Sequence, residues 1–282
     1  MAKAPSKAVA KIEESKDLAP MSDAPDYLTG NERTGAEALG KGDFKVPRIK
    51  LLQPLSPEVR TFQGKAFAGH FWHTGANKSL GIEFNFVPII VNKRVVVWRP
   101  RDDNNGGILA FSKDGKNWDS GGNSEFTVKL KDVAKPVTWK TGKDVQSSGL
   151  LEFGSSNPDV ANSSPAATIA YEYLCYLPND PQLSPVVLGV SKTGTPNARQ
   201  LNTYFLSINK PLTCMVIKCF TEEVSKNRNV WTVPKFDPAG WAPREWYHVA
   251  QEMQKNYADY ETEMVQDEQQ ENIAPIDDEV AY

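Results

Sequence analysis

The alternation of apolar and polar positions predicts β-strands along most of residues 46–237. Residues Ile82–Phe86 alternate as a half-buried strand does, and β-branched residues continue from Ile89 to Trp98. We expect Pro88 to interrupt the strand between these two runs. Further strands are predicted at residues 125–130, 166–177 and 185–190. Residues 212–220 and 229–233 predict a hairpin with its turn at residues 226–229.

Helical spacing of apolar residues occurs twice. The segment Pro196–Ile208 starts with a proline and follows a predicted capping residue, Thr195, and its apolar face consists of Ala198, Leu201, Phe205 and Ile208. A second helix is predicted from Pro243 to about Glu263, with an apolar stripe of Trp246, Val249, Ala250 and Met253. The chain is therefore predicted to be mainly β with two helices, an α+β protein.

Two long segments, residues 99–124 and 138–165, carry weak signals of secondary structure and are predicted to be loop insertions. Strands, a helix and further strands joined by elaborated loops fit a small β-barrel such as the OB-fold. We predict a flexible N-terminal arm at residues 1–45 and an OB-like nucleic-acid-binding domain at residues 46–240. A C-terminal helix at residues 241–263 and a disordered acidic tail at residues 264–282 complete the predicted organisation.

Charge is distributed unevenly along the chain, and this distribution bears on the function that the sequence predicts. The net charge is −3, yet residues 259–282 hold nine acids and no Lys or Arg. Residues 46–258 hold 25 bases and 18 acids, so this body carries +7. A basic body with an acidic end indicates a polyanionic partner for which the tail competes.

Several broad classes of protein are not expected. No run of about 18 apolar residues predicts a membrane helix, and the N-terminus lacks the apolar stretch of a signal peptide. The three cysteines lie in apolar runs, which indicates reduced thiols in a cytoplasmic protein.

Motifs of the common enzyme classes are absent from the sequence. There is no GxxxxGK[ST], strand-linked GxGxxG, GxSxG or HExxH, so neither an enzymatic activity nor a cofactor is predicted. Asp102 and Asp103 could hold a divalent ion, but adjacent acids in such a loop are more often solvated turn residues. His70 and His73 have zinc-ligand spacing, but no CxxC pair accompanies them. No metal site is predicted.

Basic and aromatic residues are interleaved in the first half of the body. One run holds Lys93, Arg94, Trp98, Arg99 and Arg101, and Trp72, Trp118 and Trp139 flank it. Cations neutralise phosphates and release counterions, and exposed aromatic rings stack on unpaired bases. The alternative is that the tryptophans are core residues and the cations a solvated surface. Because several of these tryptophans lie in Gly/Asn/Lys-rich loops, where a core position is hard to make, binding is favoured for the set.

A second basic set surrounds the start of the internal helix. Lys192 and Arg199 would place cations beside backbone N–H groups that favour a phosphate, although a plain strand-to-helix turn explains the pattern equally well. Arg228 in the predicted hairpin could line the same groove, and Trp231 is predicted to stack on bases.

The end of the chain combines acids with a terminal aromatic side chain, in Asp277, Asp278, Glu279 and Tyr282. Such a segment cannot fold alone, but it can place its ring and carboxylate in a basic, apolar pocket of a partner. It could also occupy the chain's own basic groove when DNA is absent. A merely solubilising acidic terminus is the alternative.

These features together resemble bacteriophage single-stranded DNA-binding proteins, above all the replication proteins of short-tailed phages. The segment SKTGTPNARQLNTYF, an apolar strand and then KNRNVWTVPKF are similar to a pattern in phage proteins of this kind. The resemblance implies that the tail docks on a polymerase and a helicase and regulates DNA binding by competition. The chain differs from that family in its size, in its two long loops and in its Val-Ala-Tyr end.

The sequence therefore predicts a non-enzymatic single-stranded DNA-binding protein of phage replication or recombination, acting in the host cytoplasm. Its further partners would be replication or recombination proteins, and it would not contact a membrane. The alternative is an interaction factor that binds a host enzyme, RNA polymerase or a nuclease, without touching DNA. A structural virion component and a metal-dependent nuclease are less favoured. Homo-oligomerisation and the choice between DNA and RNA are left open.

Overall fold

In the computed structural model, the described residues are 45–258, except 101–102, 104–106, 131–132, 134, 161 and 227–228. The predicted arm and acidic tail lie outside the described residues, so these two predictions stay untested. The strands are β1 (Arg48–Leu51), β2 (Phe71–His73), β3 (Lys78–Gly81), β4 (Glu83–Trp98), β5 (Ile108–Ser112), β6 (Glu125–Val128), β7 (Val137–Lys140), β8 (Ala167–Tyr176), β9 (Val186–Ser191), β10 (Met215–Lys226) and β11 (Asn229–Trp241). The helices are α1 (Pro57–Thr61), α2 (Thr195–Ile208) and α3 (Arg244–Asn256), with 3-10 turns η2 (Pro181–Leu183), η3 (Lys192–Gly194) and η4 (Leu212–Cys214).

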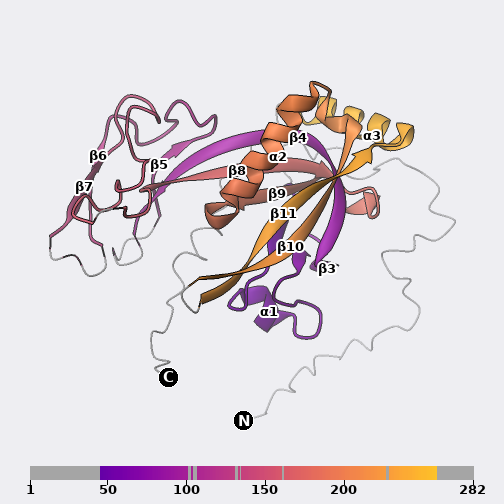
Figure 1. Cartoon of the computed structure of the whole chain (residues 1–282), viewed down its shortest axis with the longest axis horizontal. Helices are drawn as coiled ribbons and strands as arrows, with labels where there is room; N and C mark the ends of the chain where they lie inside the picture. The colour runs from indigo at the N-terminus through magenta and orange to yellow at the C-terminus, as the bar shows by residue number, and fades with distance from the viewer. Residues whose placement is uncertain are drawn as a thin grey trace, which may run out of the picture. The chain divides into compact units, whose positions relative to one another are not determined.

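Nine of these strands form one sheet. Its order is β11-β10-β4-β8-β9-β1-β2-β3, with β5 paired to β4, while β6 and β7 form a separate two-stranded sheet. Only the pairing of β1 with β9 is parallel among the described strands. The sheet is strongly curled, like half of a barrel (Figure 1). The predicted mainly β, α+β fold with an OB-like, barrel-like sheet is therefore confirmed.

Strand β4 is continuous across the proline that we expected to interrupt it. The pairing of β4 with β8 shifts register between Pro88 and Ile90, and the strand then continues to Trp98. A proline has no backbone N–H to donate to a ladder, and a bulge removes the need for that donor. The prediction of a break at Pro88 is wrong because the bulge absorbs the proline within one long strand.

The internal helix is confirmed and the C-terminal helix differs in length. Helix α2 begins at Thr195, one residue earlier than predicted, and its N-cap position is Gly194 rather than Thr195. Helix α3 ends at Asn256, short of the predicted end near Glu263. The predicted hairpin is also confirmed, although its strands are longer than expected.

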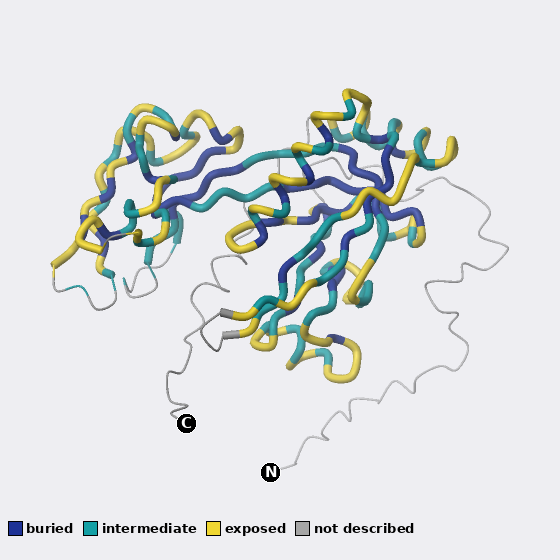
Figure 2. The backbone as a smooth tube through the Cα atoms, in the orientation of Figure 1, coloured by how far each residue is buried: buried dark blue, intermediate teal, exposed yellow. Residues whose placement is uncertain are grey.

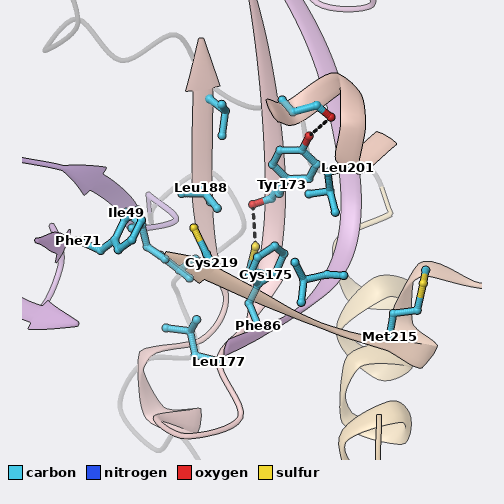
Figure 3. Close-up of a cluster of buried hydrophobic side chains, with 14 of the residues drawn as sticks. Ile49, Phe71, Phe86, Tyr173, Cys175, Leu177, Leu188, Leu201, Met215 and Cys219 are labelled. Carbon is cyan, nitrogen blue, oxygen red and sulfur yellow. Dashed lines mark hydrogen bonds between the residues drawn. The ribbon is translucent and has the colours of Figure 1, made fainter. Parts of the chain in front are cut away.

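Apolar side chains fill both faces of the sheet because strand residues alternate in direction. Tyr173 and Cys175 of β8 join the core beneath α2, whereas Leu174 and Tyr176 join a second core beneath α3. In the core beneath α2, the buried Tyr173 hydroxyl contacts the Ala198 carbonyl oxygen at 3.3 Å (Figure 3). The same hydroxyl lies 2.9 Å from the Asn202 side-chain oxygen, which accepts a hydrogen bond from it. We call these two sides of the sheet the α2 face and the α3 face.

The segments predicted as long loops fold around a third apolar core. Buried residues from β4, β5, β6, β7 and β8 form it, and they include Val97, Leu109, Val128, Val137 and Trp139. We call residues 107–166, which build this core on the ends of β4 and β8, the lobe. The interpretation of residues 99–124 and 138–165 as loop insertions is therefore wrong in part, because they contain β5, most of β7 and packed side chains.

Candidate nucleic-acid interface

Strands β4 and β8 run from the main part of the sheet into the lobe through a segment that we call the neck, and β9 pairs with β8 there as far as Ala170. The neck consists of Val91–Val95 of β4 paired with Ile169–Tyr173 of β8. The backbone is mostly half-buried here and is buried on either side (Figure 2). The neck is therefore a partly solvent-accessible stretch of sheet between two apolar cores.

On the α2 face of the neck, Lys93 lies directly opposite Tyr171, and both side chains are half-buried. Tyr171 in turn pairs with Val190 of β9. The Lys93 stem packs over the lobe, because a Cβ added at Gly115 would lie 3.0 Å from its Cδ and Cε atoms. Stem packing of this kind leaves the ammonium group at the solvent edge.

Exposed cations lie on both sides of this Lys93–Tyr171 pair. On the lobe side, Lys113 and Lys116 flank Gly115. On the β9 side, Lys192 follows the strand end in η3, and Arg199 lies in the early part of α2. Neighbouring strands are about 4.8 Å apart, so β4 and β9 are separated by roughly 10 Å at this point. We call the set Lys93, Lys113, Lys116, Tyr171, Lys192 and Arg199 the neck site.

Two acids of the lobe, Asp114 and Asp119, lie beside the cations of the neck site, and Asp119 accepts a hydrogen bond from the backbone N–H of Lys113 at 2.6 Å. The Asp114 carboxylate accepts hydrogen bonds from the backbone N–H groups of Asn117 and Lys116, at 2.8 and 2.6 Å. These bonds lower the pKa of Asp114 from 3.8 to about 2. The carboxylate is therefore ionised at neutral pH and offsets one of the five cations.

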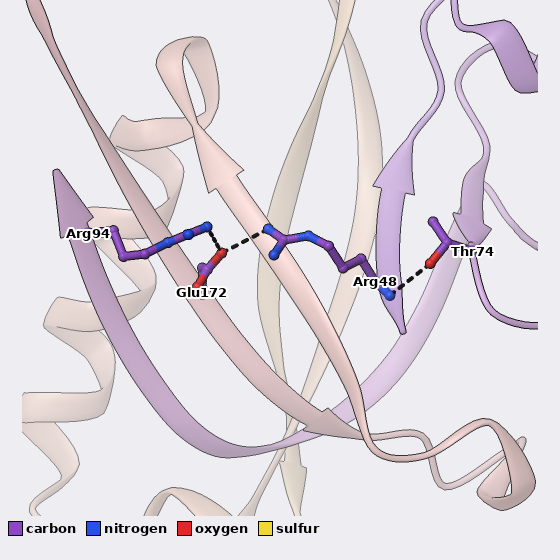
Figure 4. Close-up of polar contacts among 4 residues, drawn as sticks. All are labelled: Arg48, Thr74, Arg94 and Glu172. Carbon is purple, nitrogen blue, oxygen red and sulfur yellow. Dashed lines mark hydrogen bonds and ion pairs between the residues drawn. The ribbon is translucent and has the colours of Figure 1, made fainter. Parts of the chain in front are cut away.

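The α3 face of the neck holds an ion cluster instead of an exposed site (Figure 4). Glu172 Oε1 accepts from Arg94 Nη2 and, at 2.8 Å, from Arg48 Nη2. Gly189, opposite Glu172 on β9, leaves room for Arg48, because a Cβ there would lie 2.9 Å from its Nη2. The cluster joins β1, β4 and β8. Since Arg94 is only 2% exposed, the prediction that it contacts phosphates is wrong for this structure.

Three of the tryptophans predicted to stack on bases are packed inside the protein. Trp72 is 1% exposed and packs beside Phe62, with ring centroids 5.1 Å apart. Trp139 is 4% exposed, and its indole N–H donates to the Ser156 carbonyl at 3.0 Å. Trp118 is half-buried against the lobe core and donates to the Thr141 carbonyl at 2.9 Å. The stacking role is therefore wrong for Trp72 and Trp139, and the indole N–H of Trp118 is already used.

The other predicted residues are dispersed. Trp98 and Trp231 are half-buried on β4 and β11, and the indole N–H of Trp231 has no acceptor among the described residues. Arg99 forms an ion pair with Asp103 at 2.9 Å. Of the remaining calls, Arg101, the Arg228 side chain and the tail residues Asp277, Asp278, Glu279 and Tyr282 lie outside the described residues. Among the described residues, the predicted phosphate contacts that belong to the neck site are Lys93, Lys192 and Arg199.

Tyr171 was not singled out in the sequence. It lies in AATIAYEYLCYL, where every second residue from Ala167 to Leu177 faces α2 or the lobe core. What distinguishes Tyr171 from the other tyrosines of β8 is its position opposite Lys93 on β4. That position depends on the strand register, which the sequence alone does not determine here.

The described residues show neither a cluster of metal ligands nor a helix that could span a membrane. In the described part of the chain, no group of three or more His, Cys, Asp or Glu residues is arranged to hold a metal ion. His73 is buried, and its Nε2 is hydrogen-bonded to the Leu183 carbonyl oxygen at 3.1 Å. Burial lowers the pKa of the His73 imidazole. The cysteines of the body are free, and burial raises the pKa of Cys175 and Cys219. No described helix has the length and apolar character needed to cross a bilayer.

Fold and site together define a curled β-sheet protein in which a neck that carries cations and Tyr171 joins the main part of the sheet to a smaller lobe. The family model of the Pam3 phage gp34-like protein matches residues 13–263 of the chain. The chain therefore belongs to this phage protein family. Searches of curated proteins and of solved structures found no match.

Proposed function

We propose that this phage-family protein binds single-stranded DNA in phage replication or recombination, as a non-enzymatic factor in the host cytoplasm. The observation that carries the proposal is the neck site, where Tyr171 lies between cations contributed by β4, the lobe and the start of α2. Cations at this spacing suit a phosphate backbone, and a partly exposed ring suits an unpaired base. A base within a duplex is already stacked and paired, so the site favours a single strand.

The charge of the body supports the proposal. Residues 46–258 carry +7, and the remainder of the chain is net negative. A positive body draws a polyanion from solution and makes its binding depend on salt. The lysines and arginine of the neck site provide the local contacts that this long-range attraction requires.

Fluorescence anisotropy of a labelled single strand tests the neck site. Lys93→Met keeps the stem that packs over Gly115 and removes the charge. We expect the slope of log K against log salt to shrink by about 0.7, the value for one phosphate on a single strand. Lys255→Met, an exposed lysine of α3, is the matched control and should leave the slope unchanged. Equal slopes for all three proteins would refute the neck as the binding surface.

The ring of Tyr171 is tested separately from charge. Tyr171→Leu removes the aromatic face, and we expect about tenfold weaker binding from the loss of one stacked base. Tyr171→Phe keeps the face and should bind nearly as the parent protein does. If leucine and phenylalanine behave alike, stacking at Tyr171 is excluded.

The acidic tail is proposed to compete with DNA for this surface and to dock on replication or recombination proteins. Removal of residues 259–282 eliminates nine acids, so the body should bind a single strand more tightly at low salt. Equal affinities of the full chain and residues 1–258 at low salt would contradict competition by the tail.

A second candidate function, binding of a host enzyme without DNA contact, is favoured by exposed apolar side chains. Leu206 on α2 is 83% exposed, and Trp241 at the end of β11 is 66% exposed. Exposed large apolar residues are frequent at protein interfaces. Absence of any binding to single strands at low salt would favour this function over the first.

A further inference from the structure

The positive charge of the body is concentrated at its N-terminal part. Residues 46–98 hold seven bases and two acids, which is a net charge of +5. Residues 99–166, which include the lobe, hold nine bases and nine acids. From Val59 to Ile82 the sequence contains no acid at all. The strongest local excess of cations therefore lies around α1, β2 and β3 rather than in the lobe.

An exposed aromatic ring accompanies these cations. Phe67 is 48% exposed, and Arg60 and Lys65, which precede it in the chain, are exposed as well. Within the described residues, neither of these two cations forms an ion pair. We call residues 53–70, which carry this group, the α1 corner.

Packing and hydrogen bonds hold the α1 corner in place, and with it the exposed ring of Phe67. Leu52, Ala66 and Trp72 form a small buried core beneath it. The Phe67 ring lies 5.2 Å from the His70 ring, centroid to centroid, and the His70 N–H donates to the Phe67 carbonyl at 3.1 Å. A solvent-exposed ring on an ordered segment needs no new ordering when it stacks on a ligand.

The free end of the β10–β11 hairpin is attached to the same corner. The Gln53 side chain donates to the Thr232 carbonyl at 3.0 Å and accepts from the Thr232 N–H at 3.2 Å. Figure 1 shows α1 beside this end of the hairpin. These paired bonds fix the corner to the edge of the main sheet.

We propose that the α1 corner is a second contact surface for the single strand bound at the neck, with Phe67 stacking on a base and Arg60 and Lys65 contacting phosphates. The inference rests on the proposed function and extends it to a second site. Arg60 and Lys65 match the charge of a phosphate backbone, since residues 59–82 hold no acid and the nearby Glu58 is paired with Lys50 at 3.1 Å. The aromatic face of Phe67 accepts a base without sequence preference.

The distance between the two surfaces determines which strands can reach both. Phe71, at the edge of the corner, pairs with Gly81, and Glu83 begins β4 two residues later. Lys93 of the neck lies ten residues beyond Glu83 along β4, so this strand separates the neck from the region of the corner by up to about 33 Å. A strand filling both surfaces must be longer than one that fills either alone.

Two sets of variants test the corner by anisotropy with a labelled 30-nucleotide strand. Arg60→Gln with Lys65→Gln should shrink the salt slope by about 1.4, since two phosphate contacts are lost. The matched control, Lys210→Gln with Lys255→Gln, removes two exposed charges elsewhere and should leave the slope unchanged. Phe67→Leu should weaken binding about tenfold, while Phe67→Trp should preserve it.

The outcomes separate the two proposals. Weaker binding by both the corner and the neck variants, with additive losses in the combined protein, supports a single strand that contacts both surfaces. Binding that the neck variants weaken but the corner variants do not would overturn the corner and leave the proposed function standing. If the parent protein binds no single strand at low salt, both proposals fail. Equal tolerance of leucine and tryptophan at Phe67 would indicate an apolar peptide contact and overturn base stacking.

Discussion

Neutralising Glu172 is expected to destabilise the protein strongly, because this carboxylate compensates two guanidinium groups on the α3 face of the neck. Its side chain is 1% exposed, that of Arg94 is 3% exposed and that of Arg48 is 15% exposed. Glu172→Gln retains the shape of the side chain and removes its charge. Arg94 is then left in a buried position without the carboxylate that faces it.

The size of the effect follows from this burial. Removing one partner of a buried ion pair costs about 3–5 kcal/mol, because a buried charge is left uncompensated. Arg48 is close enough to the surface to regain water, so its share of the cost is small. We therefore expect Glu172→Gln to lower the free energy of unfolding by about 3 kcal/mol.

Urea unfolding followed by tryptophan fluorescence measures this loss, since Trp72 and Trp139 are buried in the folded protein. Glu223→Gln, at an exposed position of β10, is the matched control and should change the free energy by less than about 0.5 kcal/mol. Replacing Arg94 and Glu172 together by methionine should cost less than Glu172→Gln alone, because no buried charge remains on either residue. A loss below about 1 kcal/mol for Glu172→Gln would refute the reasoning.

Three further predictions concern the lobe and the core. Gly121→Ala should destabilise the lobe severely, because its Cβ would overlap the Leu109 carbonyl oxygen, whereas Gly149→Ala, with a similar positive φ but open space, should cost only about 1 kcal/mol in urea unfolding. Because the folded-state pKa of Asp114 is lowered to about 2, its carboxylate should stabilise the protein above about pH 4, and the stability difference from Asp114→Asn should shrink as pH falls from 4 towards 2. Cys219, which is fully buried with a raised pKa, should resist alkylation in native buffer and react only on unfolding, as measured by mass spectrometry.

The sequence predicted the elements better than the positions of the aromatic residues. Helix α2 and the strands β4, β8, β9, β10 and β11 of the main sheet were accessible because their apolar residues recur at helical or alternating spacing, whereas the short strands β1, β2 and β3 were not predicted. In the lobe only β6 was predicted, because the turns of the lobe are rich in Gly, Asn and Lys and its strands have only four or five residues. Its core forms from β4 and β8 together with residues 107–166, and these contacts are distant in sequence. Trp139 was therefore expected on an exposed loop although it is buried.

The candidate site depended on strand register in the same way. Lys93 and Arg94 are neighbours in sequence but point to opposite faces, one towards the lobe turn at Gly115 and the other towards Glu172. A shift of one residue would exchange these two roles. The sequence could therefore predict a basic strand but not which cation reaches solvent, nor that Tyr171 lies opposite Lys93.

The most direct test of the account is an equilibrium titration of the full chain with a labelled 30-nucleotide single strand and with a duplex of the same sequence, at low and at physiological salt. We expect the single strand to bind more tightly than the duplex, and its affinity to fall linearly on a logarithmic plot as salt rises. Equal or tighter binding of the duplex, or no binding of the single strand at low salt, would contradict the central claim.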